Sequence, residues 1–141
     1  MKEKRNRRKQ ATKLLSKISS WVKSGVVSVQ HGEPLIIAEL ASLDGQSQKA
    51  TKEYEVAILL AGRSGKTNFR ALAHERYAAH ADRQNDGNDA RYHYSHAVKL
   101  YREWGAYGKA DHLEEKIQSL MAEATVEFSN TPAASPLDTP S

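Results

Sequence analysis

The chain has 141 residues, enough for one domain with a single buried core. Hydrophobic residues make up 39% of it and charged residues 27%, as in ordinary globular domains, and no apolar run approaches the roughly 20 residues that a membrane-spanning helix needs. Cysteine is absent, which excludes disulfides and thiolate metal ligands and favours a reducing compartment, the cytoplasm or alternatively the nucleus.

The formal net charge of +4 is unevenly distributed along the chain. Residues 1–23 hold nine Lys/Arg and one acid, whereas the rest holds twelve Lys/Arg and sixteen acids. We therefore expect a basic arm, residues 1–13, attached to a mildly acidic body. Such an arm attracts nucleic acid, an anionic membrane surface or an acidic protein. The candidate binding residues of the arm are Lys4, Arg5, Arg7, Arg8 and Lys9.

Helical periodicity predicts about six helices in the body, residues 14–125. An amphipathic helix over residues 11–22 ends near Ser24-Gly25. Residues 26–33 favour extended structure but have no partner strand, which indicates a connector, and Pro34 suits the first turn of the next helix. That helix stops near Asp44-Gly45. The remaining helices are expected at about residues 46–62, 69–83, 89–105 and 109–124, with polar or glycine-containing turns between them.

Two alanine–tyrosine ladders lie forty residues apart and are the strongest structural signal in the chain. Their spacing of i, i+4, i+7 and i+11 places four side chains on one helical face. The first ladder is Ala50, Tyr54, Ala57 and Ala61, and the second is Ala90, Tyr94, Ala97 and Tyr101. The helix before each ladder carries small residues at the same offset, namely Ala38 and Ala41, then Ala78 and Ala81.

The ladders predict an all-α fold of antiparallel helix pairs, with two repeat units between an N-terminal and a C-terminal helix. Alanine lets a neighbouring helix approach closely, and tyrosine fills the space beside it. The alternative is an irregular bundle with alanine-rich seams. Residues expected in the core are Tyr54, Ala57, Tyr94, Ala97, Trp104 and Leu113.

The pattern resembles the tetratricopeptide repeat, whose alanine–aromatic–alanine signature falls on Ala50-Tyr54-Ala57 and Ala90-Tyr94-Ala97. The period here exceeds the usual length of about 34 residues, and the closing proline is absent. A narrower resemblance, over residues 71–115, is to the closing helical-repeat segment of large multidomain signalling ATPases and sensor kinases. Its matching residues are Tyr101, Trp104-Gly105-Ala106, Lys109, Leu113 and Glu114, and residues 14–23 resemble the start of that region.

In that family the segment is a helical spacer and docking surface, so the resemblance implies a non-catalytic module that binds another protein. In tetratricopeptide-like stacks the first helix of each pair lines a concave groove. Carried over by position, the resemblance nominates Glu39, Ser42, Glu75, Asp82 and Arg83 as partner-binding residues. Two alternatives are a nucleic-acid-binding accessory protein that uses the basic arm, and a remnant or fragment of a larger signalling protein.

Three motifs suggest chemistry, and each lacks a required part. Residues 61–67, AGRSGKT, resemble a phosphate-binding loop, but Leu60 stands where its first glycine belongs. His74-Glu75 begins a zinc-protease motif whose second histidine is replaced by alanine. His93 and His96 share a helical face and would need His80 or His112 to bind zinc. We expect no enzymatic activity, no cofactor and no metal site.

The last segment, residues 126–141, differs in composition from the body. It is rich in proline, serine and threonine and has few large apolar side chains, so it is predicted to be a disordered tail. Three Ser/Thr-Pro dipeptides in it fit a proline-directed kinase, although an unmodified tail is the simpler interpretation.

Overall fold

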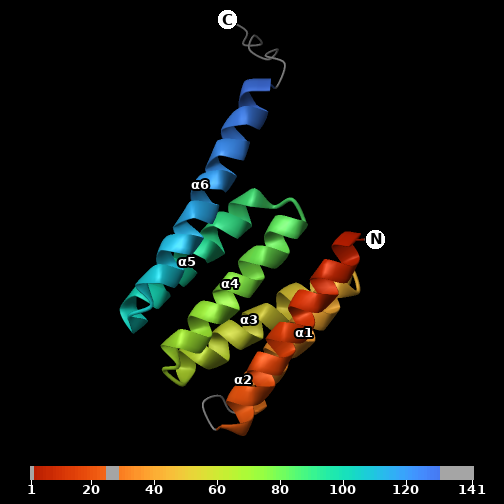
Figure 1. Cartoon of the computed structure of the whole chain (residues 1–141), viewed down its shortest axis with the longest axis vertical. Coiled ribbons are helices and arrows are strands. Elements are labelled where there is room, and N and C mark those ends of the chain that lie inside the picture. Colours follow the sequence, from red (N-terminus) through yellow and green to blue (C-terminus); the bar gives the residue numbers. More distant parts are fainter. Residues whose placement is uncertain (1, 25–28, 131–141) are drawn as a thin grey trace, which may run out of the picture.

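The fold is all-helical (Figure 1). A computed structural model describes residues 2–24 and 29–130, and the side chains of residues 9, 12–21, 23–24, 30 and 32–126. The helices of this part are α1 (Lys2–Lys23), α2 (Val29–Leu43), α3 (Ser47–Arg63), α4 (Thr67–Arg83), α5 (Gly87–Trp104) and α6 (Tyr107–Asn130). None of the helices in these ranges has both the length and the apolar character needed to cross a membrane.

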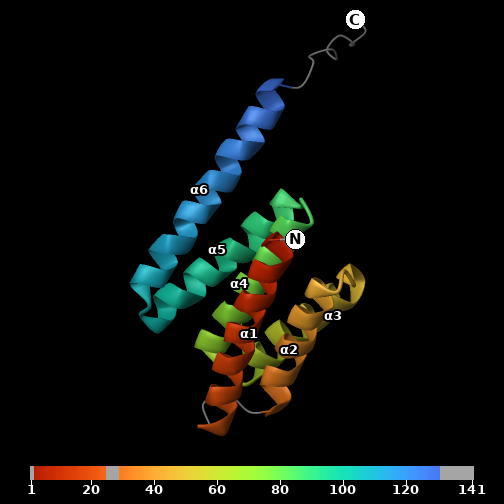
Figure 2. The same ribbon diagram turned by 45° about the vertical axis from the view of Figure 1, so that its right-hand side comes forward.

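The helices pack mainly against their neighbours in the chain, most extensively α4 against α5 and α2 against α3. The connections from α2 onward are short, over residues 44–46, 64–66, 84–86 and 105–106. In both views the chain folds back at each of these turns, and α6 runs beside α5 and continues past its end (Figures 1 and 2).

The turns from α2 onward are alike, with a positive-φ residue every twenty residues, Gly65 at 69° and Gly105 at 94° among them. The turn before α3 and the turn before α5 each contain a residue with positive φ, Gly45 at 77° and Asn85 at 62°. Both turns are closed by a 2.9 Å hydrogen bond, from Gln46 N to Ala41 O and from Asp86 N to Ala81 O. Positive φ favours glycine and tolerates asparagine, which explains the residue found in each turn.

Ladder residues form the interior. All eight are buried, with Tyr54 0% and Tyr94 3% exposed, as are the four alanines of α2 and α4 that face them. One part of the core surrounds Tyr54 and draws on α1 to α4, and a second surrounds Tyr94 and draws on α4 to α6. Leu113 is buried as expected. Trp104 is not, because it is the last residue of α5, beside the Gly105 turn, and 57% of its surface is exposed.

Several predicted boundaries differ from the structure. Helix α2 begins at Val29, so the end of the expected connector is helical and Pro34 lies inside the helix, where it is buried. Helix α6 runs to Asn130 and so includes the first residues assigned to the tail. The predicted connector residues 26–28 and tail residues 131–141 lie outside the described residues. Helix α1 begins at Lys2, so the basic arm and the first amphipathic helix are continuous in backbone.

Candidate functional site

A groove of about 610 Å³ lies over α4, between α1 and the turn that joins α5 to α6. Figure 2 shows α1 passing in front of α4 on this side of the protein. We call it the basic–aromatic groove, after the lining residues that dominate its chemistry. These are the cations Lys13, Lys17, Arg76 and Lys109 and the aromatic residues Trp21, Tyr101 and Trp104.

A buried carboxylate on α4 joins α4, α5 and α6 at the floor of the groove. Glu75 is 8% exposed, accepts a 2.8 Å hydrogen bond from Tyr101 Oη and forms a 2.8 Å ion pair with Lys109 Nζ. Burial, followed by the negative charge of Glu75, raises the pKa of Tyr101 far above its ordinary value. The phenol therefore remains a neutral donor to the carboxylate.

A second buried carboxylate orients Arg76 of the groove. Glu39 of α2 accepts hydrogen bonds from Arg76 Nε at 3.2 Å and from Arg76 Nη2 at 3.1 Å. Tyr54 Oη of α3 donates to the same carboxylate at 2.5 Å. Burial and the charge of Glu39 raise the pKa of Tyr54 well above its usual range. The bidentate geometry fixes the guanidinium plane, so this part of the floor is rigid.

The walls of the groove carry exposed cations and indoles. Lys13 and Lys17 are exposed on α1, and Lys17 Nζ lies 5.3 Å from the ring centroid of Trp21. Trp104 faces the groove from the end of α5 with more than half of its surface exposed. Tryptophan is enriched at protein interfaces, because its ring is apolar and its N–H can donate a hydrogen bond. Together these side chains can hold anionic and apolar groups of the same ligand.

The structure turns three of the five nominated partner-binding residues inward. Glu39 and Glu75 are the two buried carboxylates described above. Ser42 is 7% exposed; its Oγ accepts a 2.7 Å hydrogen bond from Arg83 Nη2 and lies 2.7 Å from His80 Nδ1. Asp82 is exposed and Arg83 is half-buried. Of the five, only Glu75 lines the basic–aromatic groove.

Sequence reasoning missed the residues of α1 that form one wall of the groove. Lys13, Lys17 and Trp21 are spaced i, i+4 and i+8, which places them on one helical face. This spacing is the feature of the sequence that could have identified them. Lys9 of the predicted arm is exposed at the same spacing, whereas the side chains of Lys4, Arg5, Arg7 and Arg8 lie outside the described residues.

The remaining motifs have simple structural settings. Residues 61–67 form the end of α3, a turn and the first residue of α4, so a helix precedes the turn where a phosphate-binding loop has a strand. The rings of His93 and His96 pack against the ring of His74, and not against those of His80 or His112. Among the residues with described side chains, no group of three His, Asp or Glu is arranged to hold a metal ion.

Comparison of the chain with protein-family models, with curated proteins and with solved structures returned no match. The resemblance to tetratricopeptide-like repeats and to the helical segment of signalling ATPases and sensor kinases therefore stays a prediction.

Proposed function

We propose that the protein is a non-catalytic docking module whose basic–aromatic groove binds an acidic segment of another protein. The observation that carries this proposal is the meeting of four cationic and three aromatic side chains, from α1, α4, α5 and α6, in one groove. Two of the cations, Arg76 and Lys109, are held by buried carboxylates, and Lys13 and Lys17 are exposed on the wall.

This chemistry favours a short peptide with acidic and apolar side chains. Acidic groups complement the lysines, and an aromatic or aliphatic side chain fits against Trp21 and Trp104. The volume of about 610 Å³ suits a few residues of an extended or helical segment, not a whole domain surface. Charge complementarity would then contribute mainly to selectivity and to the association rate.

The forty-residue period supports a repeat module of the tetratricopeptide kind as the scaffold. Helix α6 follows α4 by the same interval, but Asp111 and Gln118 replace the buried Ala71 and Ala78 of α4, and both are exposed. Repeat arrays need a terminal helix with a polar outer face. We infer that α6 closes the stack and that partner binding uses the basic–aromatic groove, not further stacking.

Peptide display tests the proposal. A random library selected on the protein should yield sequences enriched in Asp and Glu beside an aromatic or aliphatic residue. The double variant Lys13→Glu/Lys17→Glu changes only exposed residues and should lose these peptides. The control Lys49→Glu/Lys52→Glu makes the same charge change on exposed positions of α3 and should retain them. Selected peptides without acidic residues, or peptides that bind both variants equally, would refute the proposed site.

Nucleic acid is the second candidate ligand, because Trp21 and Trp104 could stack on bases while Lys13 and Lys17 contact phosphates. Fluorescence anisotropy of labelled oligothymidine should then show binding that weakens with salt. The logarithm of the association constant should fall against the logarithm of the salt concentration with a slope of roughly −0.7 per phosphate contacted. Trp21→Ala and Trp104→Ala should each weaken binding if the groove is the site. Binding that depends only on residues 1–10 would place nucleic acid on the arm.

A further inference from the structure

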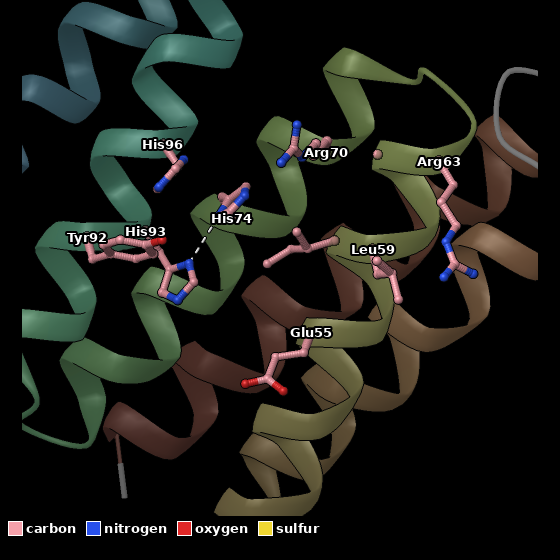
Figure 3. Close-up of a pocket in the computed structure, with 10 residues that line it drawn as sticks. Glu55, Leu59, Arg63, Arg70, His74, Tyr92, His93 and His96 are labelled. Atoms are coloured by element: carbon pink, nitrogen blue, oxygen red, sulfur yellow. Dashed lines mark hydrogen bonds between the residues drawn. The ribbon is translucent and has the colours of Figure 1, made fainter.

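A second pocket, of about 560 Å³, opens between α3, α4 and α5 (Figure 3). Its α3 side contains the apolar side chains of Ile58 and Leu59 and, at the end of that helix, Arg63. Its α4 and α5 sides contain Arg70, His74, His93 and His96, with Tyr92 beside the last two. Glu55 of α3 is the acid among the lining residues. We call it the histidine pocket. It shares no lining residue with the basic–aromatic groove.

The histidines form one connected cluster. His74 Nδ1 and His93 Nδ1 lie 3.0 Å apart, so one ring donates a hydrogen bond to the other (Figure 3). The ring of His96 stacks on His74 with centroids 4.9 Å apart. Burial, with the neighbouring His93, His96 and Arg70, lowers the pKa of His74 to about 3. The His74 imidazole is therefore neutral at neutral pH, in an electropositive setting.

Two buried nitrogens on the α4 side of the pocket have no hydrogen-bond partner in the described part of the protein, His74 Nε2 and Arg70 Nε. His74 is only 5% exposed. A buried donor without an acceptor is costly, so such groups call for an explanation. Arg70 lies against the end of α3, since a Cβ at Gly62 would be in ordinary van der Waals contact with Arg70 Nε, at 3.5 Å. The two nitrogens thus belong to adjacent side chains of one pocket.

We propose that the histidine pocket binds a small organic carboxylate with an apolar body. The carboxylate oxygens accept hydrogen bonds from Arg70 Nε and His74 Nε2, and the apolar body lies against Ile58, Leu59 and Tyr92. The ligand selects the tautomer in which His93 donates to His74 and His74 keeps its proton on Nε2. Because both nitrogens are buried, entry requires rim side chains to turn aside, of which Tyr92 is 57% exposed.

A carboxylate fits better than a phosphate. The Arg70 guanidinium lies at one of the two unbonded nitrogens, and the second guanidinium of the lining, the exposed Arg63, is offset by the negative charge of Glu55. The net charge of these three side chains therefore suits a monoanion. A phosphate dianion would need more positive charge and would leave the apolar side chains of Ile58 and Leu59 unused.

Histidine-ring NMR on the full chain tests the proposal, with 4-phenylbutyrate as the probe and 4-phenylbutanol and inorganic phosphate for comparison. We expect saturable shifts of the His74 and His93 ring signals with 4-phenylbutyrate. The alcohol should bind about tenfold more weakly, because it lacks the charge-assisted hydrogen bonds. Absence of saturable shifts, equal affinity for the alcohol, or equal affinity for phosphate would each overturn the proposal.

Variants locate the site. Arg70→Gln and His74→Gln should each weaken 4-phenylbutyrate binding about tenfold, and His112→Gln, at an exposed position of α6, should leave it unchanged. Should either pocket variant fail to fold, Leu59→Glu serves instead, because Leu59 is 53% exposed and the new charge would repel the carboxylate. Undiminished binding by folded Arg70→Gln or by Leu59→Glu would refute the assigned site.

Discussion

The two helix pairs, α2–α3 and α4–α5, have alanine–tyrosine faces that match at all ladder positions but the last, Ala61 against Tyr101, and the polar groups around these faces differ. Tyr54 in the first pair is bonded to the buried Glu39, whereas forty residues after Glu39 the second pair has Ala79. The hydroxyl of Tyr94 makes no protein hydrogen bond among the described side chains, and its ring lies 5.8 Å from Lys116 Nζ. In the second pair it is Tyr101 that donates a hydrogen bond to a buried carboxylate, that of Glu75. The apolar period therefore carries the fold, and the polar residues vary independently of it.

The largest effect should come from removing the carboxylate of the first pair. Glu39→Ala leaves Arg76 and Tyr54 without their shared buried partner and should lower the free energy of unfolding by about 3–5 kcal/mol. Urea unfolding measures it. Glu103→Ala, an exposed acid at the end of α5, is the control and should change stability by less than about 0.5 kcal/mol. Equal losses for the two variants would mean that Glu39 is not held as described.

Truncation of the second ladder tyrosine comes next. Tyr94→Ala removes an aromatic ring that is 3% exposed and should cost about 3 kcal/mol by urea unfolding. Tyr54→Ala should cost more, because it also removes the hydrogen bond to Glu39. An unchanged unfolding midpoint for Tyr94→Ala would show that the ladder face of α5 is not buried.

Removing only the hydroxyl groups separates packing from hydrogen bonding. Tyr54→Phe takes one donor away from Glu39 and should cost about 1–3 kcal/mol. Tyr94→Phe keeps the ring and should cost less than about 0.5 kcal/mol. The difference between the losses of unfolding free energy in the two variants measures how much more the Tyr54 hydroxyl stabilises its pair than the Tyr94 hydroxyl does. Equal losses would contradict the hydrogen bond between Tyr54 and Glu39 as the distinguishing feature.

The helices could be predicted because their signals are local. The alanine–tyrosine spacing and the turn residues Gly45 and Asn85 depend only on helix and turn geometry, and the all-α class is confirmed. The first turn of α2 was missed because Pro34, which suits a first helical turn, instead lies inside α2, which begins at Val29. The antiparallel tetratricopeptide-like arrangement stays a prediction.

The binding residues could not be placed in the same way, because their positions depend on contacts between distant segments. The buried carboxylate of Glu39 is bound by Arg76, which comes 37 residues later in the chain. That of Glu75 is bound by Tyr101, which comes 26 residues later. The exposure of Trp104 depends on where α6 passes after the Gly105 turn. No periodicity within one helix encodes these contacts.

The smallest effect is a pH dependence that belongs to the second pair. His74 has a folded pKa of about 3 against about 6.5 for an unfolded histidine, so protons bind preferentially to the unfolded chain. Its contribution to stability is complete above pH 6.5 and is lost as the pH falls toward 3. Between pH 7.5 and 5.5 the free energy of unfolding should drop by about 1.4 kcal/mol for this group alone. Burial also lowers the pKa of His93, which adds to the drop within the same cluster. It lowers the pKa of His80 too, but that ring lies against Ser42 and Ser47 of the first pair.

Urea unfolding at the two pH values measures this drop, and His74→Gln should reduce it, while the exposed His112→Gln should not. Positions forty residues before His74 and His93 are Pro34 and Glu53, so the first pair has no equivalent cluster. Amide hydrogen exchange should therefore show acid-dependent opening in α4 and α5 before α2 and α3. Equal acid sensitivity of the two pairs would mean that the histidine cluster does not control the stability of its own pair.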